Sequence, residues 1–409
     1  MKHTEGNRNM FRKLLVLCVI VMLSVTLGAT SIAQDDMETY VLGVALPFSG
    51  NLGTFGQDFA RGVELAVSQV NAELEAAGSA IRFEIASADT ENTPEGAARA
   101  VQTIAQTTGA QVMVGPLTTS EVLGAKQFAD ENGVVIVAPA SSGAAGAIPG
   151  DNIYRVIYPP DVFASKAYAN IALERGHENM AVLHLDDPFG NGMNESFTAN
   201  FQAGGGGEVA SFAYAPGSTE LSSEAAAVSA ALAGFGDNAG FFCVCFLSGA
   251  QAFLQVAQID PILTSVQWMG NEAMTAEEIL ADQGHAQTLA NADFITVSFS
   301  AESTPLTQIF IDDFNAMFDK DPGIFTNYAF DAANIAMLTM LAVGNDGAAV
   351  KSMLPFIANH YIGTAVQAFL DDNGDQAIAS YGLYQVSDDL SEFAEVGAYN
   401  GNTDTITYN

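Results

Sequence analysis

Two short clusters of small polar residues follow neighbouring apolar segments of the chain. The clusters are Thr118, Thr119 and Ser120, and Ala140, Ser141 and Ser142. Each follows an expected strand, 111–115 or 134–138, and the first precedes an expected helix, 121–132. Hydroxyls and the free N–H groups at a helix start bind carboxylates. The same residue types also cap helices without binding anything, so both interpretations stay open on spacing alone.

A third polar position, Glu272, comes just after the expected strand 266–269. A carboxylate at such a strand end can hold an ammonium group. The alternative is a solvated surface glutamate, which is the more common case in an acidic protein.

The chain lacks the sequence patterns of common enzymes and metal sites. It has no G-x-S-x-G elbow, no H-E-x-x-H helix and no P-loop. The turn 371–375 is rich in Asp, Asn and Gly, but Gly382 stands where an EF-hand needs glutamate. Cys243 and Cys245 lie two apart in an expected strand, a geometry that does not favour bridging them. We therefore expect two unbridged buried cysteines, and no enzyme activity, metal or cofactor.

Strands and helices alternate along most of the chain, which predicts βαβ units and parallel sheets. The pattern runs from residue 40 to 138, restarts near residue 161 and returns near residue 294. A chain of 409 residues exceeds one ordinary core. The fold class expected is α/β, with two Rossmann-like lobes around mostly parallel sheets.

The first 33 residues have the layout of a secretory signal peptide. Basic residues precede the apolar run 14–27, and Ser31 and Ala33 suit a cleavage site. That run is shorter than the roughly 20 residues that span a bilayer. We therefore expect residues 1–33 to be removed and the rest to be exported.

The chain is strongly acidic, with 47 Asp and Glu against 13 Lys and Arg and a net charge of −34. Nucleic acid and anionic lipid surfaces are excluded as partners, because both require clustered basic residues. Such self-repulsion opposes compaction unless salt screens it, which suggests a saline habitat.

Seven segments, in order, resemble the type I periplasmic binding proteins, specifically the branched-chain amino-acid group. They are GVALPFSGNLGTFGQDFARGVELAVSQVN (43–71), VGPLTTSEV (114–122), VAPASSGA (137–144), YRVIYPPD (154–161), LDDPFGNGM (185–193), WMGNEAM (268–274) and FLDDNGD (369–375). The resemblance covers about residues 40–400. It implies two lobes joined by three hinge crossings, with the ligand held between them. The expected lobes are 38–157 plus 296–362, and 158–295 plus 363–409.

The resemblance implies ligand contacts at eight positions: Phe55, Thr119, Ser120, Ala140, Ser142, Phe189, Phe246 and Glu272. The hydroxyl loops would hold the ligand's carboxylate, and Glu272 its amine. The three phenylalanines match positions where the family commonly has tyrosine or another aromatic residue. Phe189 and Phe246 lack the hydroxyl, which implies a more apolar pocket, and Phe246 could instead belong to the core. Tyr158 is expected near the hinge.

The function that the resemblance implies is extracytoplasmic binding of a solute for an ABC importer. The ligand would be an amino acid with an aliphatic or branched side chain, delivered to a membrane permease by a monomer. Two alternatives stay open: another small carboxylate or amide as the ligand, and a ligand sensor instead of a transport component.

Overall fold

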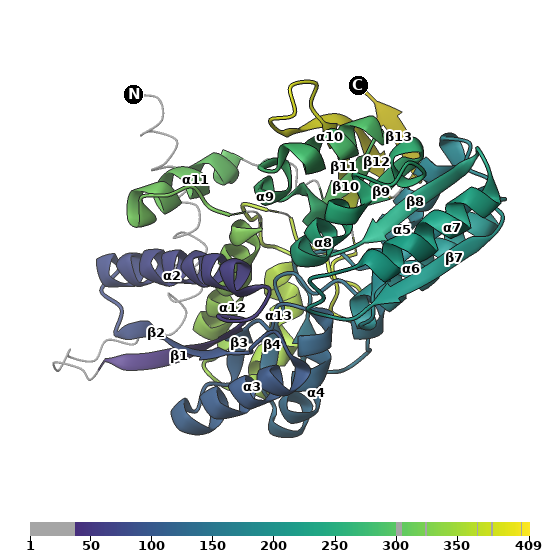
Figure 1. Cartoon of the computed structure of the whole chain (residues 1–409). Coiled ribbons are helices and arrows are strands. Elements are labelled where there is room, and N and C mark those ends of the chain that lie inside the picture. The colour runs from purple at the N-terminus through teal and green to yellow at the C-terminus, as the bar shows by residue number, and fades with distance from the viewer. Residues whose placement is uncertain (1–36, 300–304, 324, 366, 378, 402) are drawn as a thin grey trace, which may run out of the picture.

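A computed structural model describes residues 37–409 except 300–304, 324, 366, 378 and 402. The expected signal peptide, 1–33, lies outside these residues. Two lobes lie side by side, each built on one β-sheet with helices against it (Figure 1). Within the described ranges, no helix is long and apolar enough to cross a membrane.

The first lobe has a five-stranded parallel sheet in the order β2-β1-β3-β4-β5. Its strands are β1 (Glu38–Leu46), β2 (Ile81–Asp89), β3 (Val112–Val114), β4 (Val135–Val137) and β5 (Ile153–Tyr154). Its helices are α2 (Gly53–Ala76), α3 (Pro94–Thr108), α4 (Thr119–Asn132), α11 (Pro305–Phe318), α12 (Thr326–Val343) and α13 (Gly347–Ala358), with the 3₁₀ turn η1 (Ala144–Gly146).

The second lobe has an eight-stranded sheet in the order β13-β12-β11-β10-β9-β8-β6-β7. Its strands are β6 (Asn179–Leu185), β7 (Val209–Tyr214), β8 (Ala239–Val244), β9 (Gln267–Gly270), β10 (Ile295–Phe299), β11 (Ser380–Val386), β12 (Phe393–Asn400) and β13 (Thr405–Tyr408). Its helices are α5 (Asp161–Glu174), α6 (Pro188–Ala203), α7 (Ser222–Phe235), α8 (Leu247–Ala257), α9 (Glu277–Leu280) and α10 (Gln283–Asn291), with the 3₁₀ turns η2 (Leu263–Ser265) and η3 (Glu272–Thr275).

The expected fold class is confirmed, with one correction to the boundary between lobes. Strand β10 pairs with β9 and β11 in the second sheet, whereas the expected division placed residues from 296 onward in the first lobe. The return therefore begins after Phe299. The alternation of strand and helix gave no sign of this, because an added parallel strand looks alike in either sheet.

Helix α2 shows how local sequence brings the first lobe together. Phe59, Val63 and Ala66 recur at helical spacing and are fully buried. Gly62 lies where α2 meets α12, and a Cβ there would come within 2.5 Å of the Thr326 carbonyl oxygen. The glycine therefore permits a close approach that any side chain would prevent.

Two of the segments between the lobes are joined by a fully buried ion pair. The Arg155 Nε donates to an Asp375 carboxylate oxygen at 2.6 Å, and its Nη2 donates to the other oxygen. The backbone N–H of Arg155 donates to Gly374, and that of Gln376 donates to Arg155. Its remaining Nη1 donates to the Gly143 carbonyl at 2.7 Å. One guanidinium thus connects two crossings and a loop that follows β4.

Removing one partner of this pair would leave an uncompensated buried charge. We expect Arg155→Met or Asp375→Leu alone to cost about 3–5 kcal/mol of unfolding free energy. The double variant should lose clearly less than the sum of the singles, because no lone charge remains. Urea unfolding of all four proteins measures this, and additive losses would contradict it.

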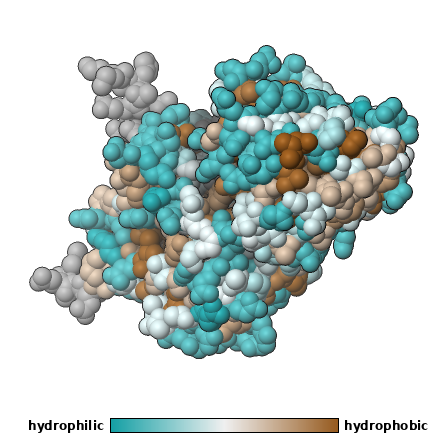
Figure 2. Space-filling view, in the orientation of Figure 1, coloured by the Kyte–Doolittle hydropathy of each residue, from teal (hydrophilic) through white to brown (hydrophobic). Residues whose placement is uncertain are grey.

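The few basic residues outside residues 1–33 are almost all paired with carboxylates. Those in ion pairs are Arg61, Arg99, Lys126, Arg155, Lys166, Arg175 and Lys320. The other two, Arg82 and Lys351, donate hydrogen bonds to main-chain carbonyls. On the face that Figure 2 shows, hydrophilic residues cover a large part of both lobes, with apolar areas between them. The surplus carboxylates therefore have no basic partners to offset their repulsion.

This surplus predicts a salt-dependent stability. The screening length falls from ~30 Å at 0.01 M salt to ~8 Å at 0.15 M, so repulsion should weaken and the thermal midpoint should rise over that range. Sucrose serves as the control, because it strengthens burial without screening charge. A midpoint unchanged by dilute salt would contradict the charge argument.

Candidate ligand-binding site

A cavity of about 110 Å³ lies where the two lobes meet, beyond the carboxyl ends of several parallel strands. By the space that one water requires, ~10–15 Å³, it could hold on the order of eight water-sized groups. This matches a small ligand. Most of its lining is apolar: Leu52, Phe55, Phe59, Leu117, Ala140, Ala164, Phe189, Met193, Phe246, Leu247, Ala273, Val297 and Phe325.

The structure brings seven of the eight predicted contact residues to this cavity. They are Phe55, Thr119, Ala140, Ser142, Phe189, Phe246 and Glu272. Ser120 is not among the lining residues, and its hydroxyl is 3.1 Å from that of Thr118. Successive residues of a helix point roughly 100° apart, so Ser120 does not share the direction in which Thr119 meets the cavity. The binding role of all eight remains a prediction.

The start of α4 supplies main-chain donors at the first-lobe side of the cavity. Thr118 caps the helix in a capping box with Glu121, which satisfies the Glu121 amide. The Thr119 hydroxyl accepts from the Gly143 amide at 2.9 Å and lies 3.1 Å from the Ser141 hydroxyl. The two hydroxyl loops are thus fixed to each other. Thr118 caps the helix, and Thr119 lies at the cavity. Helix capping and ligand binding, the two interpretations of this loop, are therefore compatible.

Glu272 lies at the second-lobe side, only 6% exposed, directly after β9. Its carboxylate accepts hydrogen bonds from the Tyr158 and Ser298 hydroxyls. Burial raises the pKa of Glu272 to about 7, against the lowering effect of these two donors. The solvated-surface interpretation is therefore excluded, and the site holds a carboxyl that would gain from a cationic partner.

A second buried carboxyl, Asp161, faces the same cavity and was missed by the sequence analysis. Its Oδ2 accepts from the Ser142 hydroxyl at 3.0 Å, and its amide donates to the Ser142 carbonyl. Burial raises the pKa of Asp161 to about 7, although Ser142 and nearby Arg155 favour the ionised form. No lysine or arginine is among the cavity's described lining residues. A cationic ligand group would therefore meet two carboxyls and no lysine or arginine among the lining residues.

Two further polar or aromatic lining residues, Asn271 and Phe325, were missed by the sequence analysis, as were several mostly apolar ones: Leu52, Phe59, Leu117, Ala164, Tyr168, Met193, Leu247, Ala273 and Val297. Asn271 precedes Glu272 within a quoted segment, so its position was available from the sequence. Phe325 adopts a left-handed backbone conformation before α12, which nothing in the local sequence signals. Tyr158, expected near the hinge, lies in the first crossing between β5 and α5 and also lines the cavity.

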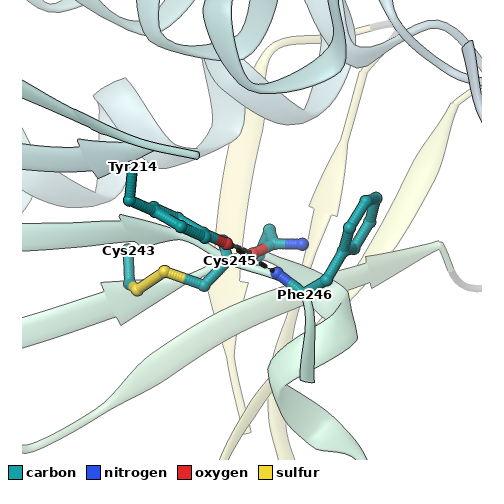
Figure 3. The surroundings of a disulfide bond; sticks show 5 residues. Tyr214, Cys243, Cys245 and Phe246 are labelled. Atoms are coloured by element: carbon teal, nitrogen blue, oxygen red, sulfur yellow. Dashed lines mark hydrogen bonds between the residues drawn. A yellow bond between two sulfur atoms is a disulfide. The ribbon is translucent and has the colours of Figure 1, made fainter. Parts of the chain in front are cut away.

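The expectation of two unbridged cysteines was wrong: Cys243 and Cys245 form a disulfide (Figure 3). Strand β8 ends at Val244, and the Cα atoms of the two cysteines are 5.4 Å apart. An extended strand would separate them by ~6.6 Å. The chain therefore leaves the extended conformation at this point, which permits the bond. Both residues are fully buried, as expected.

This site and fold define a two-lobed solute-binding protein. The periplasmic binding protein family matches residues 39–390, and the chain belongs to that family. The resemblance to the periplasmic binding proteins is thereby confirmed. Three of the curated relatives are named as binding proteins for amino acids or for Leu/Ile/Val, which agrees with the expectation of a binding protein. The family is extracytoplasmic.

Individual relatives are distant. A Leu/Ile/Val-binding protein homologue of Brucella melitensis is 26% identical over 203 residues, which are 49% of this chain and 54% of the relative. The chain spans between 53% and 59% of the length of the first curated relatives it matches.

Solved structures agree closely in fold. A leucine-binding protein of Thermotoga maritima has a TM-score of 0.76 at 18% identity, over 89% of this chain and 99% of that one. A solute-binding protein of R. palustris in complex with benzoate has a TM-score of 0.74 at 18% identity, over 91% and 98%. At these identities the likeness shows the fold alone.

The raised pKa values predict how stability varies with pH. In the folded chain the pKa of Glu272 is about 7, so it holds its proton up to about pH 7, whereas in the unfolded chain it loses the proton near pH 4.5. Stability should therefore fall as pH rises between these values, by about 3 kcal/mol for this group.

Glu272→Gln should remove that loss. The difference in unfolding free energy between variant and wild type should shift by about 3 kcal/mol in favour of the variant from pH 4.5 to pH 8. Glu277→Gln, at an exposed position, is the matched control and should show no such shift. Parallel pH profiles for wild type and Glu272→Gln would refute the assignment.

Proposed function

We propose that the chain is the extracytoplasmic binding component of an ABC importer, and that it captures an α-amino acid with an aliphatic, branched side chain. The observation that carries the proposal is the buried Glu272 carboxyl inside an apolar cavity. A carboxyl so placed is stabilised in its charged form by an ammonium group, and the apolar lining then suits a hydrocarbon side chain.

The three parts of such a ligand have separate positions. The ammonium would lie between Glu272 and Asp161. The carboxylate would face the first N–H groups of α4 and the hydroxyl of Thr119, where the helix dipole favours negative charge. The side chain would contact the Phe189 and Phe246 rings, which are stacked at 5.2 Å.

Names among the relatives support the amino-acid ligand, since proteins named for leucine or for Leu/Ile/Val share the family and the fold. Delivery to a membrane permease, export after removal of residues 1–33, and a monomeric state complete the proposal. A sensor that signals through its closed form would use the same site.

An aromatic carboxylate is the second candidate. The stacked Phe189 and Phe246 rings offer an aromatic face, and the R. palustris neighbour binds benzoate. Benzoate has no amine, so it would leave Glu272 and Asp161 without a cationic partner. The two candidates therefore differ in their dependence on Glu272.

A thermal-shift panel of leucine, isoleucine, valine, glutamine, acetamide and benzoate separates them. A ligand at 100 times its Kd adds ~2.7 kcal/mol to the native state. We expect the branched amino acids to raise the midpoint by several degrees, Glu272→Ala to abolish the rise, and Glu277→Ala to keep it. A rise with benzoate or acetamide alone would overturn the amino-acid ligand while keeping the binding fold.

A further inference from the structure

The disulfide lies one residue away from the ligand cavity. Phe246, whose ring lines the cavity and stacks on Phe189, directly follows Cys245. Its amide donates to the Tyr214 hydroxyl at 3.3 Å, and Figure 3 shows the disulfide and this bond side by side. Phe246 is also the N-cap residue of α8. The turn after β8 therefore determines the position of the Phe246 ring, which with Phe189 forms the aromatic wall of the cavity.

Asn271 fixes this turn from the neighbouring strand. Its amide donates to the Cys243 carbonyl at 3.1 Å, and its side-chain oxygen accepts from the Cys245 amide at 2.7 Å. Asn271 itself lines the cavity and precedes Glu272. The disulfide and Asn271 thus hold both ends of one short segment between the aromatic wall and the buried carboxyl.

Without the bond, the segment is free to extend. Its Cα atoms could move from 5.4 Å toward the ~6.6 Å of an ordinary strand. The surrounding core is close-packed, since Phe241 of β8, Trp268 of β9 and Phe253 of α8 are fully buried. The open space nearby is the cavity, so the change would move Phe246. A gap of ~0.5–1 Å already forfeits a quarter to a half of a packing contact.

We propose that the Cys243–Cys245 disulfide is a specificity-determining element, which positions Phe246 and Asn271 and so sets which ligand side chains the cavity accepts. The inference rests on the proposed function. It assigns the bond a role at the site, whereas a bond of merely structural role would affect overall stability and leave ligand preference unchanged.

Calorimetric titration of the protein with leucine and phenylalanine tests this. For Cys243→Ala/Cys245→Ala, we expect the leucine Kd to rise about tenfold, and the ratio of the two Kd values to change at least about threefold. Leu232→Ala is the matched control, because it removes a buried side chain of the same lobe that does not line the cavity. It should lower the thermal midpoint and leave both Kd values unchanged.

A double-mutant cycle gives a second readout. If the bond acts through Phe246, then Phe246→Ala should weaken leucine binding less in the cysteine-free background than in wild type. Kd values and ratio within about twofold of wild type in the cysteine-free protein, or the same changes in Leu232→Ala, would overturn the inference. A wild type that binds neither amino acid would instead overturn the proposed function, and the inference with it.

Discussion

The buried ion pair between Arg155 and Asp375 is the interaction on which the arrangement of the lobes depends. It joins residues 220 apart in sequence, and it stands between the two sheets with no exposed surface on the arginine. A buried ion pair adds little net stability. What this one supplies is geometry, because the Nε and Nη2 groups of the guanidinium fit one carboxylate and direct Nη1 at the Gly143 carbonyl. The loop of Ser142 is thereby fixed relative to the crossings.

The cavity resembles the ion pair in one respect: a few polar groups lie in an apolar environment. Asp161 and Glu272 come from different segments of the second lobe, and each is held by hydroxyl donors and not by a cation. Hydroxyls orient a carboxyl without neutralising it. The two buried carboxyls are therefore stabilised in their charged form when a ligand brings a cationic group.

Much of the fold could be predicted because it depends on local patterns. The strands of the first lobe and the loops at Thr119 and Ser142 were predicted from apolar runs and from the small polar residues that end them. What escaped prediction depends on long-range contact. In the sequence, Asp375 is one residue of a polar turn, and only the folded structure places Arg155 in contact with it. Three other features escaped prediction for the same reason, because they depend on contacts between distant residues. They are the sheet that β10 joins, the hydrogen bond from Ser298 to Glu272, and the bend of the chain at Cys245.

Glu272 has one consequence for how binding and movement are connected. Its carboxylate is bonded to Tyr158, in the first crossing, and to Ser298, at the end of the strand after which the chain returns to the first lobe. A ligand group that takes up one of these lone pairs also alters a restraint on the rotation of the lobes. Ligand binding and the rotation of the lobes are then linked by a coupling free energy. The coupling is reciprocal, so each shifts the equilibrium of the other by the same amount. Substitutions in the crossings can accordingly tune affinity without contacting the ligand.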